Sequence, residues 1–185
     1  MATSTAYAST ATLAGVASAW TSKDNATGAP NGTFASVVVD NTEILDSGFI
    51  ILSGFVLSTP IPPYATINGV TITATNKTTS VLETHTATLY SALTAIGSAK
   101  SYTPPVLIDS SDIGANNDIW SAPLTPSAVN GTFGVGFRVQ TAVAGTTFDI
   151  DAALLAIDYT DANPATIGLR NRNNVDPQRM AFRSR

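Results

Sequence analysis

The sequence contains no cysteine and only one histidine among its 185 residues. The absence of cysteine excludes disulfide frameworks, thiolate metal sites and cysteine nucleophiles. His85 is the one histidine available for a Ser-His-Asp catalytic triad. A lone histidine inside a predicted strand is most often a structural residue. We therefore expect a protein that is not an enzyme, and we predict no cofactor and no resident metal.

Charge is scarce as well. Charged residues make up 12% of the chain and hydrophobic residues 44%, so the charged share is about half of that in an average globular domain. Threonine, serine, asparagine and glycine take the place of the missing charge. Threonine is β-branched and favours strands, whereas lysine, glutamate and arginine would favour exposed helices. This composition is typical of proteins that face other protein in an assembly or that lie outside a cell.

Long apolar runs are missing too. The most hydrophobic segment, Gly48–Leu57, has the length of a strand, whereas a membrane-spanning helix needs about 18 or more apolar residues. The first basic residue is Lys23, whereas a secretory signal begins with basic residues that precede its apolar run. We therefore expect neither a membrane span nor a targeting segment.

The few charges are unevenly distributed along the chain. Residues 1–165 carry four basic against twelve acidic residues, a net charge of −8, whereas residues 166–185 carry five arginines against one aspartate, a net charge of +4. Such asymmetry indicates a body and an arm with different partners.

Alternation of apolar and polar residues is the main structural signal. It is strict in Val70–Thr75 and Phe133–Gln140, and it recurs in Thr147–Ala152, as expected for strands with one buried face. The last pattern slips at Leu154-Leu155, which predicts a β-bulge or burial on both faces. Three further segments are interpreted as strands: Phe34–Val39, Gly48–Leu57 and, with a less regular pattern, Thr84–Tyr90.

Turn chemistry separates these segments. Asn31-Gly32, Asn68-Gly69 and Asn130-Gly131 are strong turn dipeptides, because asparagine and glycine tolerate positive φ. One helical turn is predicted, with Thr125 as its N-cap and Pro126 as its first residue. Seven or eight strands joined by such turns predict an all-β fold, an antiparallel sandwich of two sheets.

Three segments resemble functional motifs only superficially. Asp149 and Asp151 lie two residues apart on one predicted strand face but lack the other ligands of a calcium loop, so a solvated face is the better interpretation. The same interpretation holds for Asp109–Asp112, an expected acidic loop. Gly131–Gly136 contains several glycines but opens no helix, so it is not a phosphate-binding loop.

Four ordered segments resemble a jelly-roll-like β-sandwich module of tailed-bacteriophage virion proteins. They are Trp20–Ser36, the strand entry Ile61–Val70 (Ile-Pro, an aromatic residue, Ala-x-Ile-x-Gly-Val), Trp120–Asn130 with Phe133-Gly134-Val135 (Trp, Leu-Thr-Pro, Val-Asn, Phe-Gly-Val) and Ile150–Thr160, which ends in Tyr-Thr. The resemblance covers about residues 20–160. It implies a jelly-roll fold and a structural role in a virion, and it brings no catalytic residues.

Both ends of the chain lie outside the matched segments. We therefore predict an N-terminal extension over residues 1–19, a sandwich domain over 20–160 and an arginine-rich arm over 161–185. The arm carries the residues expected to bind a partner: Arg170, Arg172, Arg179, Met180, Phe182, Arg183 and Arg185. Its scattered apolar residues and forked guanidinium groups suit an arm that lies across an acidic neighbour. A disordered solubilising tail is the alternative, and nucleic-acid binding is disfavoured because no block of basic residues is present.

Together these expectations describe a capsid decoration (cement) protein of a bacteriophage. It would lie on the capsid exterior as a homotrimer, and its ends would clamp the major capsid protein or neighbouring copies. The alternative is a tail, baseplate or fibre module, one that could recognise carbohydrate on the host surface. A glycan-acting enzyme is a third hypothesis, disfavoured because no acid/base pair stands out.

Overall fold

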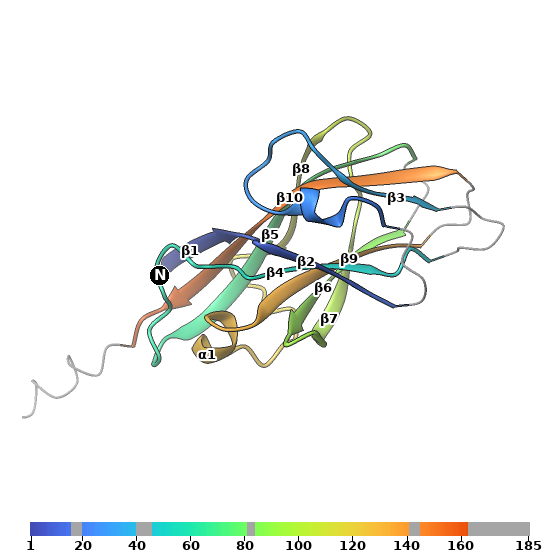
Figure 1. The fold of residues 1–185 in the computed structure, drawn as a ribbon. Coiled ribbons are helices and arrows are strands. Elements are labelled where there is room, and N and C mark those ends of the chain that lie inside the picture. Colours follow the sequence, from blue (N-terminus) through green and yellow to red (C-terminus); the bar gives the residue numbers. More distant parts are fainter. Residues whose placement is uncertain (16–19, 40–45, 81–83, 141–144, 163–185) are drawn as a thin grey trace, which may run out of the picture.

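The computed structural model describes residues 1–15, 20–39, 46–80, 84–140 and 145–162. In these residues the fold is almost entirely β, and two antiparallel sheets pack face to face (Figure 1). The prediction of an all-β sandwich is confirmed.

The first sheet, sheet A, has five strands in the described chain. They are β1 (Ala2–Tyr7), β3 (Ala35–Val39), β5 (Thr66–Thr78), β8 (Asp109–Ala115) and β10 (Thr146–Thr160). The order is β1-β10-β5-β8, and β3 pairs with the part of β10 that β1 leaves open.

The second sheet, sheet B, also has five strands in the described part of the chain. They are β2 (Thr10–Ala14), β4 (Phe49–Ser53), β6 (Thr84–Ser91), β7 (Thr94–Tyr102) and β9 (Phe133–Gln140), in the order β2-β4-β9-β6-β7. The strands β3 to β10 thus form two four-stranded layers, 3-10-5-8 and 4-9-6-7, which is the jelly-roll arrangement.

The N-terminus differs from the predicted extension over residues 1–19. Strand β1 pairs with Leu154–Tyr159 of β10, and β2 pairs with Phe49–Ser53 of β4, so the chain adds one strand to each sheet before the jelly roll begins. The sequence pattern concealed these strands because their inward residues are small. Ser4, Ala6 and Ala11 are buried, but serine and alanine give little contrast with the outward threonines.

The core lies between the sheets, where large apolar side chains from both are buried. The largest fully buried side chains are Trp120, Phe133, Phe137, Phe148, Ile50, Ile51, Leu52, Ile72, Leu89, Ile150, Leu155 and Ile157. The indole N–H of Trp120 donates a hydrogen bond to the backbone oxygen of Val70 at 2.9 Å, so this buried tryptophan keeps its polar atom satisfied.

The predicted slip in β10 is present, but it lies earlier than expected. The pairing of β10 with β5 shifts between Ile150 and Ala152, so Asp151 is the extra residue of a β-bulge. Phe148 and Ile150 face the core before the bulge, and Ala153 and Leu155 face it afterwards. The pattern at Leu154-Leu155 is therefore the consequence of a bulge three residues upstream.

The predicted helical turn is confirmed as α1 (Pro126–Val129), where the Thr125 side chain accepts a hydrogen bond from the amide of Ala128. A short 3₁₀ turn, η1 (Lys23–Ala26), precedes β3. No helix in the described residues is long and apolar enough to cross a membrane. The partner-binding residues predicted for the arm, from Arg170 to Arg185, lie outside the described residues.

Candidate functional site

The single histidine is a core residue. His85 lies in β6, is 1% exposed, and contacts Phe148 of the opposite sheet with ring centroids 4.7 Å apart. Burial lowers the pKa of His85 to about 4, so its ring is neutral at physiological pH. It joins the two sheets and faces neither outward surface.

The two aspartates predicted to share a strand face have separate partners. Asp149 accepts a hydrogen bond from Ser36 and forms an ion pair with Lys77 at 3.4 Å. Asp151, at the bulge, accepts hydrogen bonds from the backbone amides of Asn31 and Gly32 at 3.1 and 2.9 Å. Asp151 therefore fixes the Asn31-Gly32 turn. No cluster of three or more candidate metal ligands occurs among the residues that the structure describes.

The expected acidic loop at Asp109–Asp112 is wrong, because these residues begin strand β8. Asp112 lies opposite Thr73 of β5 and accepts a hydrogen bond from its hydroxyl at 2.6 Å. Most of the glycine-rich segment Gly131–Gly136 lies within a strand, since Gly134 and Gly136 belong to β9.

One hollow of the described surface is on the outward face of sheet B. It has a volume of about 470 Å³, within the range of small-molecule sites. Its residues come from β2, β4, β6, β9 and two turns, and they are Thr10, Thr12, Ile51, Ser53, Gly54, Tyr90, Ala92, Leu93, Gly131, Thr132 and Gly134. We refer to this hollow as the sheet B groove.

Glycine makes the floor of the sheet B groove. Gly134 and Gly136 of β9 lie opposite Ser53 and Ile51 of β4. A Cβ atom at Gly134 would stand 3.4 Å from Cγ2 of Ile51 and 3.3 Å from Cβ of Ser53. The missing side chain at Gly134 is therefore what leaves this floor open.

Tyr90 forms one wall and lies across the second glycine. A Cβ atom at Gly136 would meet Cε2 of Tyr90 at 2.5 Å, so the ring occupies the space that any other residue would fill. The ring also meets Phe49 edge-on, with centroids 5.8 Å apart. Burial raises the pKa of Tyr90, which keeps its hydroxyl a neutral donor and acceptor.

A second hollow of about 330 Å³ continues the sheet B groove around the end of the sheet. The two hollows share Gly54 and Gly131. The second is otherwise lined by Ser9 between β1 and β2, by residues of the loop after β4, and by the turn after α1: Phe55, Val56, Leu57, Pro60 and Asn130. Asn130 holds these two segments together, since its amide exchanges hydrogen bonds with the backbone of Ile61 at 3.0 and 2.8 Å.

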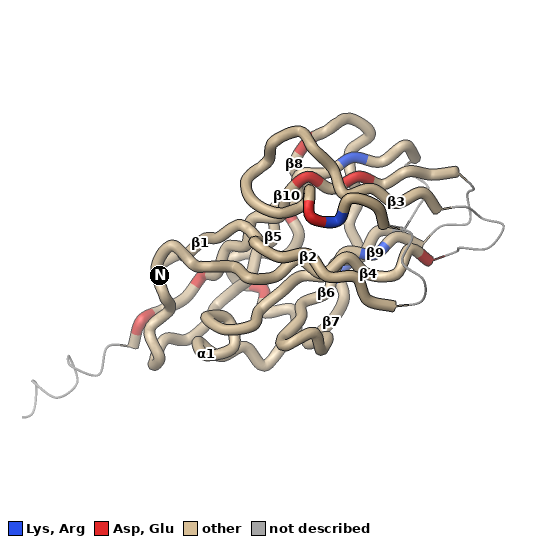
Figure 2. The backbone as a smooth tube through the Cα atoms, viewed as in Figure 1, with Lys and Arg blue, Asp and Glu red and all other residues tan. Residues whose placement is uncertain are grey.

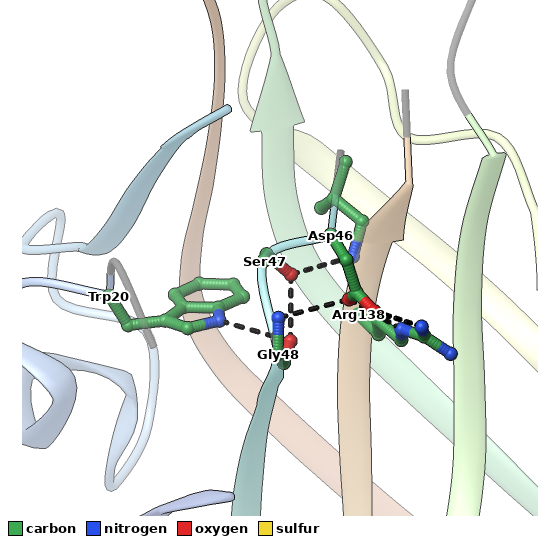
Figure 3. A network of polar contacts seen from close by, with 6 residues as sticks. Trp20, Asp46, Ser47, Gly48 and Arg138 are labelled. Atoms are coloured by element: carbon green, nitrogen blue, oxygen red, sulfur yellow. Dashed lines mark hydrogen bonds and ion pairs between the residues drawn. The ribbon is translucent and has the colours of Figure 1, made fainter. Parts of the chain in front are cut away.

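A polar network that includes Asp46, Ser47, Gly48 and Arg138 lies at the start of β4 (Figure 3). Arg138 pairs with Asp46 and stands 5.3 Å from the Phe49 ring centroid. The hydrogen bond from Arg138 lowers the pKa of Asp46. The Ser47 hydroxyl donates to the Gly48 oxygen and accepts from the Val139 amide. This network ties the start of β4 to β9, and its charges pair with each other rather than lining the groove.

Neither hollow is lined by a charged residue. Figure 2 shows the charged positions as isolated segments on an otherwise uncharged backbone. From the sequence, Tyr90 was interpreted as part of a strand and Gly131–Gly136 as a segment that is not a phosphate-binding loop, and neither was predicted to form a groove. The signal that marks them is the segment Phe133–Phe137, where bulky residues on the inward side alternate with glycine on the outward side.

Comparisons with known proteins identify structures of similar fold. No protein-family model matches the chain, and no curated protein matches it. One similar structure, described as "CBM4 structure and function", has 13% identity and a TM-score of 0.41, with 84% of this chain and 94% of that chain covered. Another, the CBM36-1 domain of a multidomain xylanase from the hindgut metagenome of Trinervitermes trinervoides, has 12% identity and a TM-score of 0.38, with 83% and 96% covered.

A third similar structure is a Stig cyclase from Fischerella sp. TAU, solved in complex with a methylpyrrolidinylidene indole. It has 15% identity and a TM-score of 0.40, with 79% of this chain and 73% of that chain covered. These similarities concern the fold alone and carry no information about ligands or activity.

Proposed function

We propose that the chain is a non-enzymatic structural protein of a bacteriophage virion that decorates the capsid exterior. The observation that carries the proposal is the division of the chain. The described sandwich completes its core with β10, which ends at Thr160, and the five arginines of residues 166–185 follow it in the sequence. A folded acidic body with a separate basic segment suits a protein that is mounted on a neighbour.

In this function the basic segment clamps the major capsid protein or a neighbouring copy, and the copies form a trimer. The arm would stabilise the capsid by enlarging the interface between subunits, because an extended arm adds main-chain hydrogen bonds and apolar contacts across the boundary between them. The resemblance of residues 20–160 to a virion module and the low-charge, threonine-rich surface agree with this role.

Deletion of residues 166–185 tests the proposal. We expect the shortened chain to fold with a melting temperature close to that of the full chain, because the strands that build the described core end with β10 at Thr160. Occupancy on purified capsids should fall strongly, measured by co-sedimentation and gel densitometry. A shortened chain that occupies capsids as fully as the intact chain would contradict the clamp.

A second candidate is a tail, baseplate or fibre module that recognises carbohydrate on the host surface. The sheet B groove favours it, because decoration by terminal arms requires no uncharged groove on the body. Copy number in purified virions separates the two candidates: hundreds of copies indicate decoration, and a handful indicate a tail position.

A further inference from the structure

The polar side chains that line the sheet B groove all carry hydroxyl groups. Thr10, Thr12, Ser53 and Thr132 line it, and none of these hydroxyls has a hydrogen-bond partner among the residues that the structure describes. The groove therefore holds a set of hydroxyls that are open to a ligand.

The same surface offers apolar contact. Ile51 lies beneath the groove, Leu93 stands 58% exposed at its rim, and Val56 stands 84% exposed beside the second hollow. Apolar side chains at the edge of a hollow can pack against the apolar faces of a ligand.

The absence of charge in both hollows limits the class of ligand. A charged ligand would lose its hydration in the groove without gaining contact with a side chain of opposite charge, and this desolvation is costly in free energy. Arg138 and Asp46, the charged pair on this face, neutralise each other. Hydroxyls both donate and accept, so a neutral ligand that is itself rich in hydroxyls, with apolar C–H faces between them, matches the groove.

The two hollows also limit the shape of the ligand. They meet at Gly54 and Gly131 and together run from β2 and β6 to the loop after β4. Two adjacent hollows suit consecutive units of a chain, whereas one compact molecule would fill one hollow.

We propose that the sheet B groove binds a neutral oligosaccharide chain. Thr10, Thr12 and Thr132 supply hydrogen bonds, Leu93 and Val56 supply apolar contact, and Gly134 provides the depth. The inference deepens the carbohydrate-recognising candidate function, but it holds wherever the protein is mounted in a particle.

The test is a titration of the full chain with defined saccharides, followed by ¹H–¹⁵N NMR. The probes are tri- to hexasaccharides of glucose, mannose, galactose and N-acetylglucosamine. Sulfated and polysialic oligosaccharides and the peptide of residues 166–185 serve as comparators. We expect at least one neutral probe to shift the amides of Thr12, Ser53 and Gly134 at concentrations up to about 10 mM.

Two variants with a matched control locate the site. Thr12→Trp fills the groove from the edge strand β2, and we expect affinity to fall at least about tenfold. Thr71→Trp places the same ring at a half-buried threonine on the outward face of sheet A, and binding should stay unchanged. Leu93→Asn removes the apolar rim at a residue of φ 65°, a conformation that asparagine tolerates, and should weaken binding about threefold to tenfold.

Several outcomes would overturn the inference. The inference is wrong if no neutral saccharide changes the amide chemical shifts, or if the changes are confined to sheet A. It is also wrong if only the anionic saccharides bind, or if the 166–185 peptide changes the chemical shifts of the groove and no saccharide does. The chemical-shift changes of the wild-type chain test the inference even if Thr12→Trp does not fold. Capsid occupancy is measured in a separate experiment. A negative saccharide titration therefore does not contradict the decoration proposal, and unchanged capsid occupancy after deletion of residues 166–185 does not contradict saccharide binding by the groove.

Discussion

The outward faces of the two sheets are built in opposite ways. On sheet A, threonine and serine hydroxyls donate to carboxylates on the neighbouring strand: Thr3 to Asp158, Thr73 to Asp112 and Ser36 to Asp149. On sheet B, glycines open a groove whose hydroxyls lack described partners and whose residues carry no charge. Several hydroxyls of sheet A are therefore used in cross-strand pairs, whereas the threonine and serine hydroxyls that line the sheet B groove form no hydrogen bond with described residues.

The difference shows how a threonine-rich sequence can produce two kinds of surface. A threonine opposite an aspartate forms a closed pair, because the short side chains reach across neighbouring strands. Thr12 of sheet B lies opposite Ile51, which offers its hydroxyl no partner. The register of the strands therefore decides which hydroxyls are paired.

The largest expected effect concerns His85, which is buried in the core between the two sheets. Protonation of His85 would place a charge between the sheets. Because its folded pKa is about 4 and its ordinary value is 6.5, the unfolded chain binds the proton more readily between these values. Its contribution is complete above pH 6.5 and falls as pH drops to 4, by about 3 kcal/mol in all. Urea unfolding at pH 7.5, 5 and 4 measures it.

His85→Phe is the control for that titration, since it keeps a ring in the core and removes the proton site. The variant should keep only the pH dependence that comes from carboxylates. Equal slopes in the variant and the wild type would show that His85 does not couple the sheets to pH.

A smaller effect is expected on sheet B when its floor is filled. In Gly136→Ala the new Cβ would meet Cε2 of Tyr90 at 2.5 Å and Cδ1 of Phe49 at 3.1 Å, so the ring must move. We expect a loss of about 1–3 kcal/mol in the free energy of unfolding and a change in Tyr90 fluorescence or ring NMR signals. Gly32→Ala does not serve as a control, because Gly32 has φ 81°. An unchanged Tyr90 environment would mean that the ring does not lie across the glycine.

The sequence predicted the parts of this fold that depend on local pattern. Phe133–Gln140 alternates bulky and small residues so regularly that its strand and its buried face follow directly. Strands β1 and β2 were missed because alanine and serine on the inward side bury little apolar area, so burial there depends on β10 and β4 rather than on the segment itself. Strand β8 was missed because its aspartates suggest a loop until their partners on β5 are known.

The groove shows a further limit. Gly134 and Gly136 are visible in the sequence, but their importance comes from Tyr90 and Ile51, which lie 44 or more and 83 or more positions earlier in the chain. Which side chains meet above a glycine depends on register between distant strands, and a single sequence fixes that register only weakly.

The smallest effect tests the comparison of the two faces directly. Thr73→Val and Thr12→Val are the same isosteric change on half-buried threonines of opposite sheets. The first removes the 2.6 Å hydrogen bond to Asp112 and should cost about 0.5–1 kcal/mol, whereas the second removes a hydroxyl without a described partner and should cost close to nothing. Chemical denaturation of both variants beside the wild type measures the difference. Equal costs would mean that the Thr12 hydroxyl is as engaged as that of Thr73, and it would then not be available to a ligand.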